Sequence, residues 1–151
     1  MSIGDFHPEG RAATHWSFWV IAVLAVLWNG FGSFDFLMTQ IQGQEYLRQM
    51  LTEEQIQDYL TMPVWAEGAW GLAIASSILA SILLLLRRTW AVPLFALSLV
   101  SMLVSFFYQL VMMGELARSG IAAAIFPAVI VAIGVFLLSY AMRQDKAGVL
   151  R

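Results

Sequence analysis

The chain alternates between long apolar stretches and short polar segments. The apolar stretches cover residues 16–38, 64–86, 90–113 and 122–142, and each is close to the ~20 residues that a helix needs to cross a bilayer. Nearly all charged residues lie outside them. The pattern predicts an all-α integral membrane protein that forms one domain over 1–151, with a polar tail at 1–15 and four transmembrane helices in an antiparallel bundle.

Basic residues are distributed unevenly between the polar segments. Only Arg48 and Arg118 lie in the first and third loops, whereas the other six lie in the two tails and the second loop. Because cytoplasmic segments carry the excess of Lys and Arg, both termini are expected in the cytoplasm. The six residues on that side are Arg11, Arg87, Arg88, Arg143, Lys146 and Arg151.

The longest polar segment, residues 39–63, carries helix signals of its own. Thr52 is followed three residues later by Gln55, which is the form of a capping box. Apolar side chains recur at helical spacing both before and after it. We therefore expect two short amphipathic helices in this first extracytoplasmic loop, either as a lid over the outer mouth of the bundle or as a hairpin that only shields helix ends. Their apolar positions are Tyr46, Leu47, Met50 and Leu51, and then Ile56, Tyr59 and Leu60.

Small residues share one face in three of the predicted helices. Lipid provides no hydrophobic drive between helices, so close approach at small side chains must hold them together. The faces therefore predict either packing within the bundle or oligomerisation. They comprise Ala22, Ala25 and Gly32, then Ala69, Ala73, Ser77 and Ser81, and finally Ala124, Ala128 and Ala132.

Three polar side chains within the apolar stretches fall at one expected depth. Asp35, Glu67 and Gln109 each lie 19 residues from the inner end of their stretch, which is ~28 Å at 1.5 Å per residue. Asn29 lies deeper, and Tyr108 adjoins Gln109. Since ionisable residues at membrane depth are candidates for function, these five are the predicted ligand-binding residues of a polar pocket at the outer end.

The two carboxylates also have a structural interpretation. Glu67 lies in the first turn of its helix, where the helix dipole favours an anion. Asp35 is expected at the end of its helix, where an anion is disfavoured, so Arg48 or Arg118 is its expected ion-pair partner. The third stretch adds a polar stripe that either forms interhelical hydrogen bonds or lines a cavity. This stripe consists of Ser98, Ser101, Ser105 and Gln109.

The amino-acid composition limits the kinds of site and partner that the chain can have. The 151 residues are 60% hydrophobic and include no cysteine, which excludes disulfides and thiolate chemistry. A net charge of −2 and the lone Arg87–Arg88 pair argue against a nucleic-acid partner. Two histidines, His7 and His15, are too few for a metal site, and the outer methionines suit apolar packing as well as copper. No metal, cofactor or catalytic motif is predicted, which favours a non-enzymatic protein.

A series of local motifs extends over about residues 28–113. They read LWNG at 27–30, FDFLMTQ at 34–40, EY at 45–46, TEEQ at 52–55, PVW at 63–65, and LLLLRR at 83–88 followed by WAVP at 90–93. Their order resembles a group of small bacterial four-helix inner-membrane proteins, some of them loosely labelled sugar transporters. By this resemblance Asn29, Asp35 and Gln40 match recurring polar positions of the group, whereas Glu67 departs from it. The resemblance implies a multi-pass protein of a bacterial inner membrane.

Three functions are consistent with these features. The first is an accessory or small-ligand-binding membrane protein that uses the outer pocket. The second is an oligomeric small-solute transporter that depends on Asp35, and the third is a structural subunit of a larger membrane complex. The expected partners are the lipid bilayer, a small-molecule ligand, and a second copy or another membrane subunit.

Overall fold

Helices make up the fold of residues 14–151, which are the residues that the computed structural model describes. The predicted tail, with His7 and Arg11, lies almost wholly outside them. No strand occurs within the described range, so the all-helical class is confirmed. Four helices are long and apolar enough to cross a membrane. They are α1 (Trp16–Gln42), α4 (Val64–Leu85), α5 (Ala91–Phe107) with its π-helical continuation η1 (Tyr108–Met112), and α7 (Ala122–Lys146).

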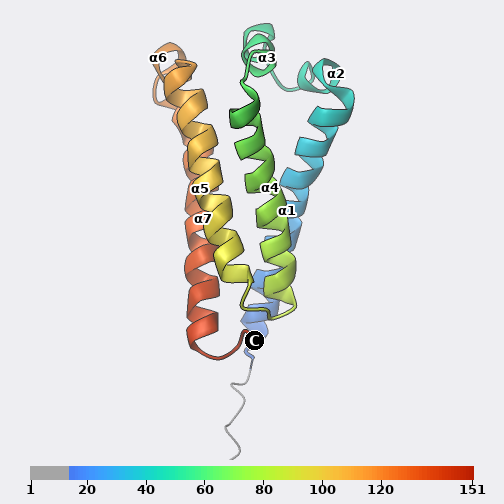
Figure 1. Ribbon diagram of the computed structural model, residues 1–151, viewed down its shortest axis with the longest axis vertical. Helices are drawn as coiled ribbons and strands as arrows, with labels where there is room; N and C mark the ends of the chain where they lie inside the picture. Colours follow the sequence, from blue (N-terminus) through green and yellow to red (C-terminus); the bar gives the residue numbers. More distant parts are fainter. Residues whose placement is uncertain (1–13) are drawn as a thin grey trace, which may run out of the picture.

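Three short helices lie together at one end of the long ones (Figure 1). Two of them, α2 (Gln44–Leu47) and α3 (Glu53–Leu60), confirm the short helices expected within 39–63. The third, α6 (Glu115–Ser119), occupies a segment expected to be a loop. It is too short for a periodic pattern, and Gly114 and Gly120, with φ of 75° and 63°, flank it on either side. We call this end of the molecule, with α2, α3 and α6, the lid end.

α1 is longer than the sequence pattern predicts. It continues past residue 38 to Gln42 and ends at Gly43, whose N–H donates to the Thr39 carbonyl over 3.0 Å. Asp35 therefore lies seven residues before the helix end. The prediction that Asp35 occupies an unfavourable terminal position is wrong, because the polar residues after 38 continue the helix rather than opening a loop.

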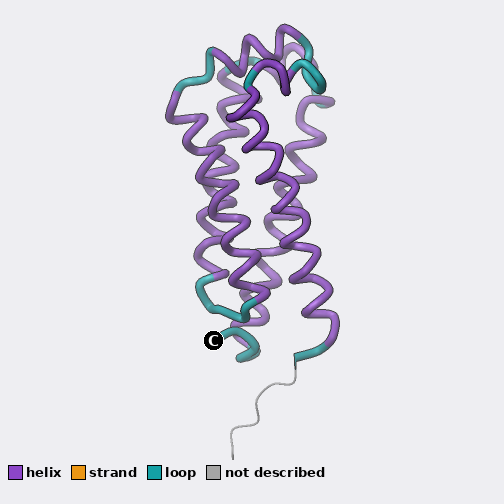
Figure 2. Tube along the Cα trace, turned by 90° about the vertical axis from the view of Figure 1, so that its right-hand side faces the viewer, coloured by secondary structure: helices purple, strands orange, loops and turns teal. Residues whose placement is uncertain are grey.

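The long helices lie side by side (Figure 2). α4 contacts both α1 and α5, and α5 contacts α7. A buried apolar cluster joins all four near the end opposite the lid, where the carboxyl terminus lies (Figure 1). We call this the tail end. The cluster includes Phe18, Ala22, Ala25, Leu84, Ala91, Phe95, Leu137 and Ala141.

Two of the three small-residue faces pack inside the chain. Ala22 and Ala25 of α1 are buried, as are Ala73, Ser77 and Ser81 of α4. On α7, by contrast, Ala124 is half-buried and Ala128 and Ala132 are exposed, so most of this third face does not pack within the chain. In α5 the predicted stripe faces inward: Ser98, Ser101 and Ser105 are buried, and Ser98 donates to the Ala73 carbonyl over 2.8 Å. This contact confirms the hydrogen-bonding interpretation for Ser98.

Candidate functional site at the lid end

Gln40, Tyr59 and Glu67 meet at the lid end from three different helices. The Gln40 amide nitrogen donates to Glu67 Oε1 and to the Tyr59 hydroxyl oxygen, each over 3.1 Å. The Tyr59 hydroxyl in turn lies 3.5 Å from Glu67 Oε1, to which it donates. This network ties lid helix α3 to α1 and α4.

Each member of the network lies near the end of its helix or just after its start. Gln40 belongs to the extra turn of α1, and Glu67 to the first turn of α4, which follows Pro63 as N-cap. Tyr59 lies on α3, whose start is fixed by the predicted capping box. The Thr52 side chain accepts from the Gln55 N–H over 3.3 Å, and the Gln55 side chain accepts from the Thr52 N–H over 3.1 Å.

A shallow depression of about 350 Å³ adjoins this network. Its wall is apolar except for Gln40 and Glu67, and its other lining residues are Phe36, Val64, Gly68 and Gly71. The Phe36 ring meets the Trp70 indole edge-on, with centroids 4.8 Å apart. Gly71 permits this arrangement, because a Cβ there would lie only 3.1 Å from Phe36 Cζ. The depression thus combines an aromatic wall with a carboxylate at its rim.

Asp35 takes part in a separate contact. Its Oδ1 accepts a hydrogen bond of 2.9 Å from the Tyr46 hydroxyl, and this bond joins α2 to α1. The hydrogen bond to Asp35, together with burial and the charge of Asp35, raises the pKa of Tyr46 above 10.0. Burial and the negative charge of Glu67 likewise raise the pKa of Tyr59. Both phenols are therefore held in the neutral form that donates a hydrogen bond.

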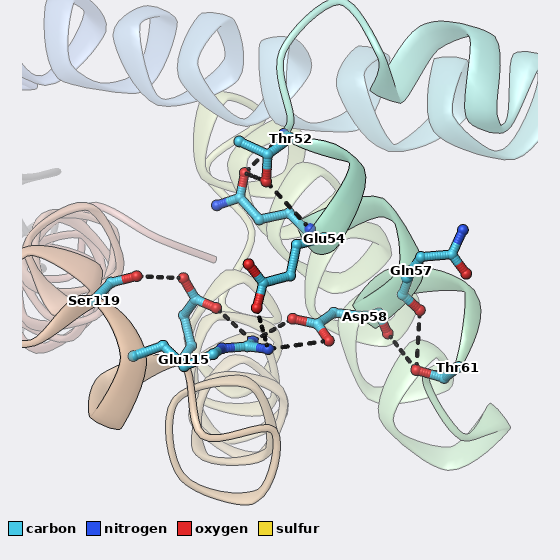
Figure 3. Close-up of polar contacts among 9 residues, drawn as sticks. Thr52, Glu54, Gln57, Asp58, Thr61, Glu115 and Ser119 are labelled. Carbon is cyan, nitrogen blue, oxygen red and sulfur yellow. Dashed lines mark hydrogen bonds and ion pairs between the residues drawn. The ribbon is translucent and has the colours of Figure 1, made fainter.

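Arg48 and Arg118, the expected partners of Asp35, pair with acids of the lid end instead. Arg48 Nε lies 3.3 Å from Glu53 Oε1. Arg118 of α6 pairs with Glu54 at 3.2 Å and with Asp58, both on α3, and with Glu115 at 2.8 Å. Figure 3 shows the three carboxylates converging from α3 and α6. The ion pair predicted for Asp35 is thus replaced by the Tyr46 hydrogen bond.

The five residues predicted to line one pocket are distributed over separate contacts. Asn29 donates to Ser81 Oγ over 2.9 Å, Gln109 donates to Ser105 Oγ over 3.2 Å, and the Tyr108 ring meets Trp65 edge-on at 5.1 Å. Among them, only Glu67 lines the depression. Counting residues along a helix gives depth but not rotation, so side chains of equal depth can face different neighbours.

Two members of the network are missing from the sequence-predicted site. The sequence pattern ends the first helix before Gln40 and gives Tyr59 only as an apolar position of a short helix. The available signal was the helical spacing of Gln40 from Phe36, i and i+4, which puts both on one face if α1 continues.

Acidic and basic residues are concentrated at opposite ends of the described chain. Seven of its eight acids lie at the lid end, whereas five of its seven basic residues lie at the tail end. Neither Asp35 nor Glu67 has a basic partner among residues 14–151, because the four ion pairs found there engage other acids. The lid end therefore carries an excess of negative charge, part of it at the rim of the depression.

Comparison of the chain with protein-family models, with curated proteins and with solved structures finds no match.

Proposed function

We propose that the chain is an integral membrane protein that binds a small amphiphile with a positively charged head group at its outer end. Four helices of membrane-spanning length and hydropathy support insertion. The cluster of basic residues at the tail end supports a cytoplasmic location for that end and for both termini. In this orientation the four long helices form an antiparallel bundle, and α2, α3 and α6 lie outside.

Glu67 is the observation that carries the ligand proposal. Its carboxylate accepts hydrogen bonds from Gln40 and Tyr59, yet it has no basic partner within the described residues. Glu67 is only half-buried, so a ligand can reach its carboxylate from the depression that it lines, and an ammonium group there would supply the missing charge partner. The apolar wall around Phe36 would hold the hydrocarbon chain of the same molecule, which reaches it sideways from the bilayer.

The test uses the chain in phosphatidylcholine nanodiscs and a brominated dodecylamine that quenches Trp70, which packs against Phe36 of the depression. The other five tryptophans are replaced by phenylalanine so that the signal comes from Trp70. Glu67→Gln is expected to weaken quenching by the amine about tenfold, the effect of losing one charge-assisted contact, and to leave quenching by brominated dodecanol unchanged. Asp35→Asn is the matched control, because it removes the same charge at the same end outside the depression.

Two results would contradict the proposal. One is an equal loss of amine binding in Glu67→Gln and Asp35→Asn, which would indicate a diffuse charge effect. The other is dodecanol binding to the wild type as tightly as dodecylamine. Transport by an oligomer and a structural role in a larger complex stay predictions, because no contact of the described residues favours either.

A further inference from the structure

The carboxyl-terminal tail folds back onto the turn between α4 and α5. Val149 and Leu150 are buried in the apolar cluster of the tail end. The Arg87 guanidinium donates from Nε to the Val149 carbonyl over 2.9 Å, and the Arg151 N–H donates to the Arg87 carbonyl over 2.7 Å. The Thr89 N–H donates to the Arg151 carbonyl over 3.1 Å. These hydrogen bonds hold the carboxyl-terminal tail against the turn between α4 and α5.

Arg87 occupies a backbone position that favours glycine. It follows α4 with a φ of 59°, and the next N–H, of Arg88, donates to the Leu83 carbonyl over 2.7 Å. This is the left-handed helix ending in which glycine is the usual residue. An arginine held in a strained conformation is a reason to look for a role of its side chain.

Three arginines surround a depression of about 310 Å³ at this turn. Its lining consists of Leu86, Arg87, Arg88 and Arg151. Arg143 and Lys146 lie nearby in the last turn of α7, and Asp145 is the one acid of the tail end within residues 14–151. None of these five basic side chains forms an ion pair with another described residue. The depression thus presents positive charge that the described chain does not neutralise.

Exposed apolar side chains lie beside the arginines of this depression. Leu86 and Trp90 are 61% and 70% exposed at the ends of α4 and α5, where a membrane-spanning helix meets the head-group layer. Aromatic side chains are enriched at that level. A ligand here would contact guanidinium groups on one side and hydrocarbon on the other.

We propose that this depression binds the phosphate head group of an anionic phospholipid of the cytoplasmic leaflet. The guanidinium groups donate paired hydrogen bonds to the phosphate oxygens, and Leu86 and Trp90 contact the glycerol and acyl chains. The inference rests on the membrane orientation proposed above, but it does not depend on the site at Glu67.

Native mass spectrometry of the chain released from nanodiscs of phosphatidylcholine with a minor share of phosphatidylglycerol tests the site. The wild type is expected to retain phosphatidylglycerol preferentially. Arg88→Gln with Arg151→Gln should lower that preference about tenfold, since it removes the charge-assisted hydrogen bonds that these two guanidinium groups donate to the phosphate. Arg143→Gln with Lys146→Gln is the control, because it removes the same charge at the same end outside the depression and should change the preference little.

Three results would overturn the inference: no preference in the wild type, an equal loss in both double variants, or displacement of the lipid by excess inorganic phosphate. The last would indicate a site for a soluble anion. If the glutamine variant unfolds, Arg88→Lys with Arg151→Lys keeps the charge but loses the paired geometry and should still weaken retention. Glu67→Gln should retain the lipid as the wild type does, so failure of the outer site and failure of this one are separable.

Discussion

At the scale of single residues, Asn29 shows how a polar side chain is accommodated between long apolar helices. Its amide donates to the Ala25 carbonyl over 3.0 Å and to Ser81 Oγ over 2.9 Å, and Ser81 is fully buried. The bond to Ser81 joins α1 to α4. Asn29 is thus a helix-packing residue in this structure, although its depth alone suggested a pocket.

Replacement of Asn29 by alanine should destabilise the chain by about 0.6–2 kcal/mol, the range for interhelical hydrogen bonds in membranes. Ser33→Ala is the control, because the Ser33 hydroxyl donates only to the Asn29 carbonyl in its own helix. Unfolding in mixed micelles with increasing dodecyl sulfate measures the difference. If Asn29→Ala and Ser33→Ala are equally stable, the hydrogen bond between Asn29 and Ser81 does not stabilise the chain.

Tyr46 should give the lid end a dependence on alkaline pH. Its pKa is raised in the folded chain, chiefly by its hydrogen bond to Asp35, so its contribution to stability is complete below pH 10 and is lost as pH rises through the raised value. Asp35→Asn should bring the phenol back towards its ordinary pKa near 10. The ultraviolet absorbance of phenolate measures this, with Tyr46→Phe identifying the transition. An unchanged titration in Asp35→Asn would contradict the contact.

At the scale of elements, ion pairs join α3 and α6 at the lid end, beside the buried side chains of Leu47 and Ile56, whereas the tail end has a larger buried apolar cluster. Arg118 is the main link between α3 and α6, and its hydrogen bonds to Asp58 and Glu115 raise its pKa further above the ordinary range. Its side chain is 35% exposed, so solvent and salt weaken each pair.

Arg118→Gln should therefore loosen α3 and α6 together without unfolding the long helices. Hydrogen exchange of the backbone amides in both short helices should become faster by a few-fold, and high salt should speed exchange in the wild type in the same way. Arg48→Gln is the control, since Arg48 has a single exposed ion pair, with Glu53. Acceleration in α3 alone, or equal acceleration in both variants, would show that Arg118 does not couple the two helices.

Elements with local signals could be predicted from the sequence, and those that depend on neighbours could not. The four long helices follow from long, predominantly apolar stretches, and the start of α3 follows from Thr52 and Gln55. The extension of α1 to Gln42 is stabilised by contacts that bring Gln40 to Glu67 and bury Thr39. The π-helical turn at Tyr108 and the exposure of Ala128 on α7 likewise depend on which helices are adjacent, which no local pattern encodes.

The same distinction applies to the candidate site. Glu67 could be singled out because a carboxylate within an apolar stretch is costly wherever it lies. Its partners could not, because Gln40 and Tyr59 reach it only after α3 has folded over the ends of α1 and α4. Asp35 could be singled out for the same reason as Glu67, and its Tyr46 partner likewise depends on how the lid folds.

At the scale of the whole molecule, the two ends differ in charge and chemistry. The lid end is rich in acids and carries the depression beside Glu67, and the tail end carries the unpaired arginines around the depression at Arg87. This asymmetry is what the positive-inside rule requires of a protein with both termini in the cytoplasm. Both proposed sites depend on the two ends facing opposite sides of the membrane.

Cysteine labelling tests this arrangement most directly, because the chain has no cysteine of its own. Gln57→Cys introduces an exposed thiol on α3, and Ala147→Cys introduces one just after α7. In intact cells that express the protein, a membrane-impermeant maleimide should label Gln57→Cys at once and Ala147→Cys only after permeabilisation. Labelling of both variants in intact cells, or of Ala147→Cys alone, would contradict the account.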